Sequence, residues 1–205
     1  MPMRTGIVIP SLGAPHLEHC LEAVAALDPS PDIRVLVVSG GAETPPSAEN
    51  FEVHRSNTRV GFAEAVNNGI AVLPAEVEMV AVLNDDATPD PTWFGALVSA
   101  FERQPELAAV QGTVVDAGGT SIDGRGIDFD RYGLPVQIDQ GLAVDVDEGE
   151  QAVLAVSGTA CLLRIQALRE VAFSNFEVLT NDSTPTMRMS ISVFVSTVWV
   201  ENPDG

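Results

Sequence analysis

The chain is short of basic residues, and this shortage limits what it can bind. Lys and Arg number 10 against 29 Asp and Glu in 205 residues, for a formal net charge of −19. A surface this acidic repels phosphate backbones, which argues against nucleic acid as a partner. It also offers no polybasic patch for anionic lipid headgroups. The charge is typical of a solvated acidic shell, such as one suited to a high-salt cytoplasm.

Cysteines and long hydrophobic runs are scarce as well. Cys20 and Cys161 are the only cysteines, and because neither shows metal-ligand spacing we expect reduced thiols in the core. No apolar run approaches the length that spans a bilayer, and Met1–Gly6 lacks the apolar stretch typical of a signal peptide. The sequence therefore predicts no transmembrane segment and a cytoplasmic location, with peripheral attachment to a membrane as an alternative.

Hydrophobic residues make up 45% of the chain and aromatic residues only 5%, which predicts one core of mainly aliphatic side chains. Short β-branched runs alternate with helical patterns along the first half. The expected strands are Thr5–Pro10, Ile33–Val38, Phe51–His54, Val77–Leu83 and Ala108–Val115. The expected helices are His16–Leu27, Gly61–Leu73 and one that opens at Asp90-Pro91. This alternation predicts a single-domain α/β fold with a mostly parallel sheet flanked by helices.

The second half is less regular. Gly118–Gly141 is rich in Gly and Asp, which favours a long surface excursion. Ala152–Leu163 is strand-like, and Ile165–Val171 begins a helix. The histidines His16, His19 and His54 stand at no expected metal position, so we expect them on the solvated surface.

Two adjacent carboxylates follow a buried strand at Asn84-Asp85-Asp86. In open parallel sheets ligands bind beyond the carboxyl ends of the strands, where this pair is expected. Adjacent carboxylates repel each other unless a cation or solvent screens them. Oxygen ligands of this kind suit Mg²⁺ or Mn²⁺ bridging a diphosphate. The alternative is that Asp85 and Asp86 only shape a turn or cap the next helix.

The segments TGIVIPS, IRVLVVSGG, NTRVGFAEAVNNGI, VLNDDATPDPTWF and VSGTACLLRIQAL, taken in this order, resemble the inverting family 2 glycosyltransferases. The resemblance covers Thr5–Val171. It implies a Rossmann-like GT-A fold and transfer of a sugar from a nucleotide-diphosphate-sugar to an acceptor hydroxyl with inversion. A rhamnosyl- or related transferase of polysaccharide biosynthesis, with a carbohydrate or lipid-linked acceptor, is the class that the resemblance suggests.

The resemblance also assigns site residues by position. Those on the nucleotide-sugar side are Pro10, Ser11, Ser39, Gly61, Asn67, Asp85 and Asp86, of which Asp86 is the better metal ligand and Asp85 the second. Gly158 and Thr159 match residues on the acceptor side. Gly61 has the alternative of serving close packing, and Asn67 that of a local cap. The second strand departs from the family because Ser39-Gly40-Gly41 stands where an acidic residue is common.

The domain that resembles the family is 1–171, and 172–205 is an atypical tail. The family continues to a GFDE…YxEDVDLSxR segment, whose Glu-Asp pair supplies the general base. This tail lacks that pair, so the catalytic residue is unknown. Back-translation of Phe176–Phe194, read one frame off with permitted codons, gives RGFDERLYSYDEDVDLSVR, and the single codons of Met187 and Met189 each supply a required G. We infer a frameshift between about Arg169 and Phe176, with a genuine strand pair over Met187–Val200 as the alternative.

Competing functions remain at this point. If the frameshift is real, the chain is a catalytically impaired remnant that binds nucleotide-sugar, although Asp128 or Asp130 could approach an acceptor. A nucleotidyltransferase would share the sheet and the carboxylates. It would need a basic residue in the loop after the first strand, and Ser11–Ala14 contains neither Lys nor Arg.

Overall fold

The computed structural model describes residues 3–13, 15–144, 149–174 and 190–200. The helices are α1 (Leu17–Ala25), α2 (Phe62–Ala71), α3 (Trp93–Arg103) and α4 (Ile165–Ser174), with a 3-10 turn η1 (Pro46–Asn50). The strands are β1 (Thr5–Ser11), β2 (Ile33–Val38), β3 (Glu52–Arg55), β4 (Met79–Leu83), β5 (Ala87–Pro89), β6 (Leu107–Asp116), β7 (Ile122–Gly124), β8 (Ile127–Phe129), β9 (Pro135–Gln137), β10 (Gln151–Val153), β11 (Ala160–Arg164) and β12 (Ser190–Val200).

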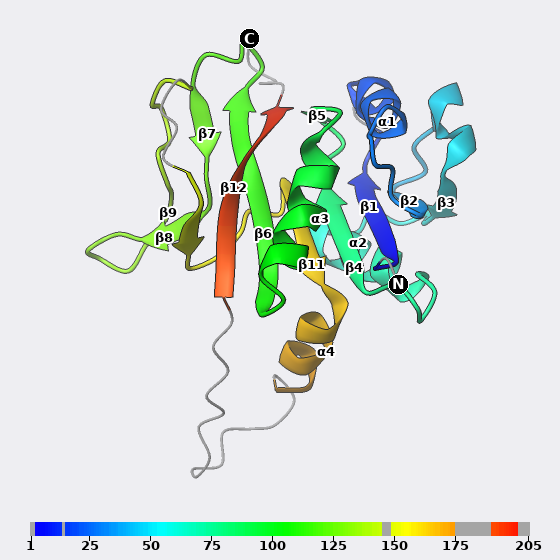
Figure 1. Cartoon of the computed structure of the whole chain (residues 1–205). Helices are drawn as coiled ribbons and strands as arrows, with labels where there is room; N and C mark the ends of the chain where they lie inside the picture. Colours follow the sequence, from blue (N-terminus) through cyan, green and yellow to red (C-terminus); the bar gives the residue numbers. More distant parts are fainter. Residues whose placement is uncertain (1–2, 14, 145–148, 175–189, 201–205) are drawn as a thin grey trace.

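One mixed sheet crosses the molecule in the order β10-β12-β6-β11-β4-β1-β2-β3 (Figure 1). Strands β1, β2, β3 and β4 pair in parallel. Strand β11 runs antiparallel between β4 and β6, while β12 runs parallel to β6. The sheet is mainly parallel and helices flank it, which confirms the predicted α/β class.

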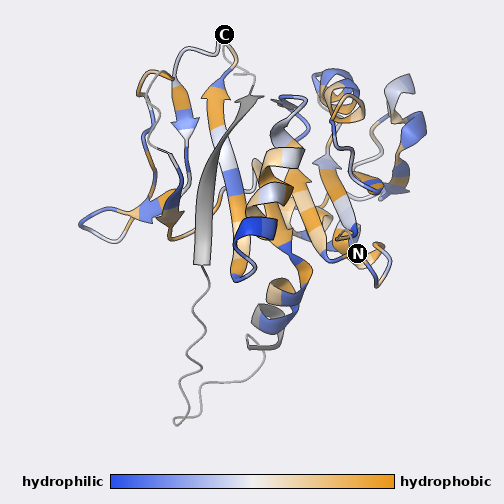
Figure 2. Ribbon diagram, in the orientation of Figure 1, coloured by the Kyte–Doolittle hydropathy of each residue, from blue (hydrophilic) through white to orange (hydrophobic). Residues whose placement is uncertain are grey.

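Helices pack on both faces of the sheet because alternate strand residues point to opposite sides. On one face, buried residues of α1 and α3 meet Ile7, Ile9 and Leu83 in the larger apolar cluster. On the other face, α2 packs its Ala65 against valines of β1 and β2. The central strands are accordingly the most apolar part of the ribbon (Figure 2). Both layers hold the carboxyl ends of β1, β2 and β4 at one rigid edge.

Helix α2 approaches the sheet closely at Gly69. A Cβ atom at this position would lie 2.4 Å from a methyl carbon of Val8 and 3.0 Å from one of Val37. By contrast, a Cβ at Gly61 would meet nothing within 4 Å. Close helix packing was one explanation offered for Gly61, and it applies to Gly69 instead.

The expected surface excursion contains short strands. Strand β7 pairs with β6, and β8 and β9 form a separate two-stranded hairpin. The expected strand Ala152–Leu163 is divided, because β10 and β11 are separated by the segment 154–159. This segment crosses from one part of the sheet to the other, so a single strand cannot hold both pairings.

The tail is described only in part. Residues 190–200 form the single strand β12. The alternative prediction was a strand pair over Met187–Val200, and residues 187–189 of that range lie outside the described residues. Most of the shifted-frame segment 176–194 also lies outside them. Among the helices that the structure describes, none is both long and apolar enough to cross a membrane.

Candidate functional site

A cleft of about 340 Å³ opens at the carboxyl ends of the central strands. It is lined by Pro10, Ser11, Leu12, Gly13, Ser39, Val60, Phe62, Ala65, Asn84 and Asp85. The sequence predicted Pro10, Ser11, Ser39 and Asp85 at this place, and the structure brings them together. Leu12 and Val60, in loops, and Phe62, at the start of α2, were missed because single apolar residues outside a periodic stripe carry no signal in the sequence.

A chain of hydrogen bonds fixes the loop after β1 to the turn after β4. The Ser11 hydroxyl donates to the Asp85 carboxylate at 2.6 Å and accepts from the backbone N–H of Gly13 at 2.9 Å. The backbone N–H of Ser39 donates to the Ser11 carbonyl at 3.0 Å. Ser11 therefore joins the three strand ends that form the cleft, and its side chain orients Asp85.

Asp86 is half-buried, and its Oδ1 atom is buried without a hydrogen-bond partner among the described residues. Burial and the neighbouring Asp85 carboxylate raise the pKa of Asp86 above its ordinary value of 3.8, while contacts that include His16 and Asn84 lower it in part. The Oδ1 atom has no hydrogen-bond partner among the described residues and the like charge of Asp85 lies beside it, so a further positive partner in addition to His16 would stabilise the pair.

His16 corrects one expectation. It was expected on the solvated surface, but it is half-buried and close enough to Asp86 to act on the pKa of that carboxyl. It stands directly before α1, at the N-terminal end of that helix. No spacing in the sequence relates residue 16 to residue 86, so only the fold could reveal this pairing.

Asp85 and Asp86 fit a divalent cation in chemistry, because an anionic oxygen without a partner accepts a hard cation readily. In the described part of the chain, however, no group of three or more His, Cys, Asp or Glu residues could hold a metal ion. A cation at this edge would therefore need ligands from a bound phosphate as well. Asp86 would be the principal protein ligand and Asp85 the second.

The predicted acceptor-side residues stand beside the same turn. The Thr159 carbonyl accepts from the backbone N–H of Asn84 at 2.8 Å. A Cβ at Gly158 would lie 3.0 Å from the ring of Phe62, which lines the cleft. Gly158 and Thr159 thus border the cleft, and the absence of a side chain at Gly158 lets the Phe62 ring approach.

Gln111, on β6, holds the segment 154–159 in place, and the sequence did not identify it as a functional residue. Its side chain is 0% exposed, and its amide oxygen accepts from the backbone N–H of Ser157 at 2.6 Å. A buried glutamine in the middle of an apolar strand is the available signal, because a buried polar side chain needs a specific partner.

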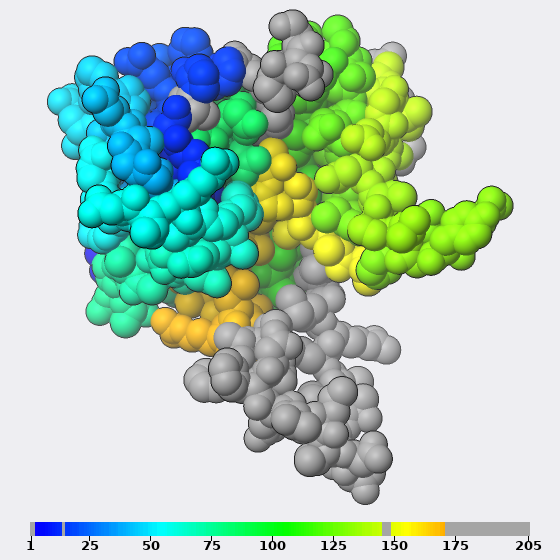
Figure 3. All heavy atoms as spheres, turned by 180° about the vertical axis from the view of Figure 1, so that it is seen from behind, coloured from blue at the N-terminus to red at the C-terminus, as the bar shows by residue number. Residues whose placement is uncertain are grey.

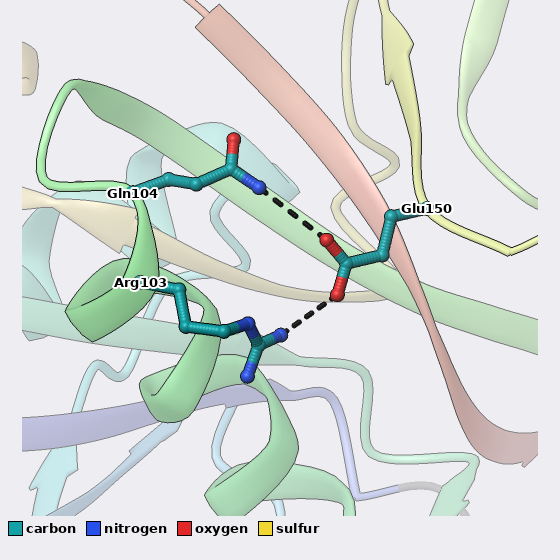
Figure 4. Close-up of polar contacts among 3 residues, drawn as sticks. All are labelled: Arg103, Gln104 and Glu150. Carbon is teal, nitrogen blue, oxygen red and sulfur yellow. Dashed lines mark hydrogen bonds and ion pairs between the residues drawn. The ribbon is translucent and has the colours of Figure 1, made fainter.

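The chain just before β10, which leads into the segment 154–159, is joined to the end of α3. Glu150, directly before β10, accepts from Arg103 at 2.8 Å and from Gln104 at 3.3 Å (Figure 4). These contacts are exposed, so their contribution to stability is small, on the order of 1 kcal/mol or less. Their effect is to position the start of the segment that leads to Ser157.

Three residues predicted on the nucleotide-sugar side are not among those that line the cleft: Asp86, which directly follows the lining residue Asp85, and Asn67 and Gly61. Asn67 is exposed on α2 and lines a separate apolar cleft beside α4, whose volume is about 660 Å³. Gly61 is exposed at the start of α2, adjacent to the cleft residues Val60 and Phe62. Helix α2 thus meets the cleft with its first turn, and Asn67 lies further along it.

Both cysteines are free and buried, as expected for core thiols. Burial raises the pKa of Cys161 to about 12. Burial, with the charges of Asp85 and Asp86, also raises the pKa of Cys20. Both thiols stay protonated, which excludes them as thiolate nucleophiles.

The fold and the cleft define an α/β protein that presents paired carboxylates at the ligand-binding edge of its sheet. Residues 6–171 match the model of glycosyl transferase family 2, and the chain belongs to that family. A glucosyl-dolichyl phosphate glucuronosyltransferase of Haloferax volcanii is similar, with 28% identity over 123 residues that cover 55% of this chain and 39% of the relative.

Among solved structures, GalNAc-T7 with UDP, GalNAc and Mn²⁺ superposes with a TM-score of 0.69 at 13% identity. The match covers 98% of this chain and 44% of that one, and it shows a GT-A-like fold. The chain therefore spans well under half the length of the relative and of the solved structure to which it is compared.

Proposed function

We propose that this chain binds a nucleotide-diphosphate-sugar in the cleft beside Asp85 and that its family activity is transfer of the sugar to an acceptor hydroxyl. The carrying observation is the Asp85–Asp86 pair: Asp85 lines the cleft, and the Oδ1 atom of the adjacent Asp86 is buried without a hydrogen-bond partner among the described residues. A nucleotide diphosphate with a shared cation would provide the positive charge that this pair needs.

Different residues of the cleft would contact different parts of the nucleotide-sugar. Pro10, Ser11 and Ser39 form the wall assigned to the base and ribose, and the exposed Phe62 ring offers an apolar face beside it. Ser11 holds the Asp85 carboxylate in place. A Mg²⁺ or Mn²⁺ ion held by Asp86 and Asp85 would neutralise charge on the diphosphate leaving group.

The acceptor would approach from Gly158 and Thr159, which border the cleft next to Phe62 and Asn84. Attack by its hydroxyl on the anomeric carbon, opposite the departing diphosphate, inverts that carbon. A lipid-linked acceptor is supported by the relative, whose name specifies glucosyl-dolichyl phosphate. Rhamnosyl transfer in polysaccharide biosynthesis at the cytoplasmic face stays a prediction of the sequence.

Thermal unfolding with a panel of UDP-, dTDP- and GDP-sugars, with and without Mn²⁺, tests this proposal. A ligand present at about 100 times its Kd stabilises the folded protein by about 2.7 kcal/mol, which is readily measured. We expect at least one donor to raise Tm only when Mn²⁺ is present. If no donor gives a cation-dependent shift, the proposed site is wrong.

A second candidate is a binding protein that turns over poorly. It is favoured by the tail 172–205, which lacks the Glu-Asp pair that the shifted frame of 176–194 would supply. We propose that residues 1–171 form the donor-binding domain and that the reading frame shifts after about Arg169. Resequencing of the source DNA decides this, and an in-frame readout of the tail as printed would contradict it.

Transfer assays separate the two candidates. Donor and Mn²⁺ should raise the Tm of the chain as it stands, but this chain should release little product. A chain with the restored frame should show a similar rise in Tm and should also transfer the sugar. Equal transfer by both chains would show that the tail does not limit catalysis.

A further inference from the structure

The hairpin formed by β8 and β9, residues 127–137, projects from the body of the molecule (Figure 3). Four of its large apolar side chains are exposed: Phe129 by 54%, Tyr132 by 72%, Leu134 by 60% and Val136 by 42%. Exposed apolar residues gathered in one short segment of a soluble surface mark an interaction site. We call this segment the hairpin arm.

The tip of the arm is an ordered turn. The Asp130 carboxylate accepts from the backbone N–H groups of Tyr132 and Leu134 at 2.8 and 2.9 Å. The Asp130 backbone N–H donates to the Leu134 carbonyl at 2.9 Å. These contacts involve backbone atoms of Tyr132 and Leu134, and both side chains stay largely exposed, with the Arg131 guanidinium 4.6 Å from the centre of the Tyr132 ring. The carboxylate is at the same time occupied within the turn.

The base of the arm is joined to the acceptor side. The backbone N–H of Ile127 donates to the Ala155 carbonyl at 2.8 Å, and that of Ala155 donates back at 3.2 Å. Leu154, next to this bridge, is 51% exposed. Two residues further on, Ser157 is held by Gln111. The apolar surface of the arm therefore continues toward the segment that borders the cleft.

The charge of the molecule distinguishes between possible partners. A second copy would carry the same net charge of −19 and would be repelled. A lipid bilayer requires no matching surface and accepts a small apolar tip.

We propose that the hairpin arm inserts Tyr132, Leu134 and their apolar neighbours into the surface of a lipid bilayer. This rests on the proposed function, in which the acceptor is lipid-linked and resides in a membrane. Insertion would hold Gly158 and Thr159 against the surface from which the acceptor headgroup projects. The net negative charge predicts a preference for zwitterionic over anionic lipid.

Co-sedimentation of the full chain with phosphatidylcholine vesicles tests the proposal. The double variant Tyr132→Ser, Leu134→Ser should bind at least about tenfold more weakly, because two large apolar side chains are lost. Val72→Ser is the matched control, since Val72 is an exposed apolar residue (37%) at the end of α2. Binding should persist in about 1 M KCl, where charge interactions are screened within about 3 Å.

The contrary outcomes are distinct. Absence of wild-type binding to vesicles, or equal binding by wild type and double variant, overturns the proposal. A dimer in light scattering that the double variant abolishes would assign the arm to a second copy instead. Vesicle binding needs no donor, so a failed donor shift would reject the proposed function without changing this result. Circular dichroism verifies folding, and Leu134→Ser alone provides a milder variant.

Discussion

Replacement of Asp86 by asparagine should stabilise the protein and abolish its cation-dependent donor binding. The pKa of Asp86 is raised, mainly by burial and then by Asp85. The folded state therefore holds a proton on Asp86 more tightly than the unfolded state does. Stability consequently falls as pH rises from 3.8 through the folded pKa, and the full cost is present at neutral pH.

The expected gain can be bounded from the structure. Asparagine keeps a polar atom at the Oδ1 position, so the substitution removes only the cost of holding a negative charge in this site beside Asp85, on the order of 1–2 kcal/mol. Because Asp86 is only half-buried, solvent screening lowers this cost, and we expect about 1 kcal/mol. For a chain of this size that gain corresponds to a rise in Tm of about 2–4 °C.

Thermal unfolding at neutral pH with chelator, and then with Mn²⁺ and donor, measures both effects. Asp123→Asn is the control, because this half-buried carboxylate accepts a long hydrogen bond of 3.4 Å from Gln140 and lies outside the cleft. In the wild type the Mn²⁺ shift should shrink as pH falls, because the cation competes with a proton. A lower Tm for Asp86→Asn, or a retained Mn²⁺-dependent donor shift, would refute the reasoning.

Three further substitutions probe separate parts of the fold. Ser11→Ala should cost about 1 kcal/mol in urea unfolding and weaken donor binding in calorimetry, because Asp85 loses the donor that orients it; unchanged affinity would argue against that role. Gly69→Ala should destabilise by about 1–3 kcal/mol, because its Cβ would lie 2.4 Å from Val8; a gain in stability would show that α2 can shift freely. Asn67→Ala should leave the donor-dependent Tm shift unchanged, since Asn67 lies outside the cleft; a reduced shift would place it in the site.

The sequence predicted the first half of the fold well because its signals are local. Strand β2 matches Ile33–Val38, and the apolar stripe of α1 (Leu17, Cys20, Leu21 and Val24) is buried. The resemblance placed Ser11, Ser39 and Asp85 in one place, and parallel strands bring their carboxyl ends to one edge. Hydrophobic patterns with a period of two or 3.6 residues, each followed by a polar turn, are sufficient to predict the strands and helices of this first half of the chain.

The features that the sequence could not predict depend on contacts between distant residues. His16 acts electrostatically on Asp86, Gln111 holds Ser157, and Gly158 lies against Phe62 only after the sheet forms. The strand-like run Ala152–Leu163 was divided because β10 and β11 pair with different strands. A hydrophobic pattern indicates that a segment is extended but not which neighbour it pairs with.

The position of the cleft residues also determines what the tail can affect. The residues that line the cleft lie between Pro10 and Asp85, and the nearest support from later in the chain is the Thr159 carbonyl. None of these contacts involves a residue after Val171, but the tail does reach the neighbouring turn. Residues Val198–Val200 of β12 pair antiparallel with Ala87–Pro89 of β5, directly after Asp86. The proposed donor site is therefore built from residues that match the family, and its metal-binding turn lies against the tail. A change of reading frame after Arg169 should consequently alter transfer most, and donor affinity less, through the β5–β12 pairing.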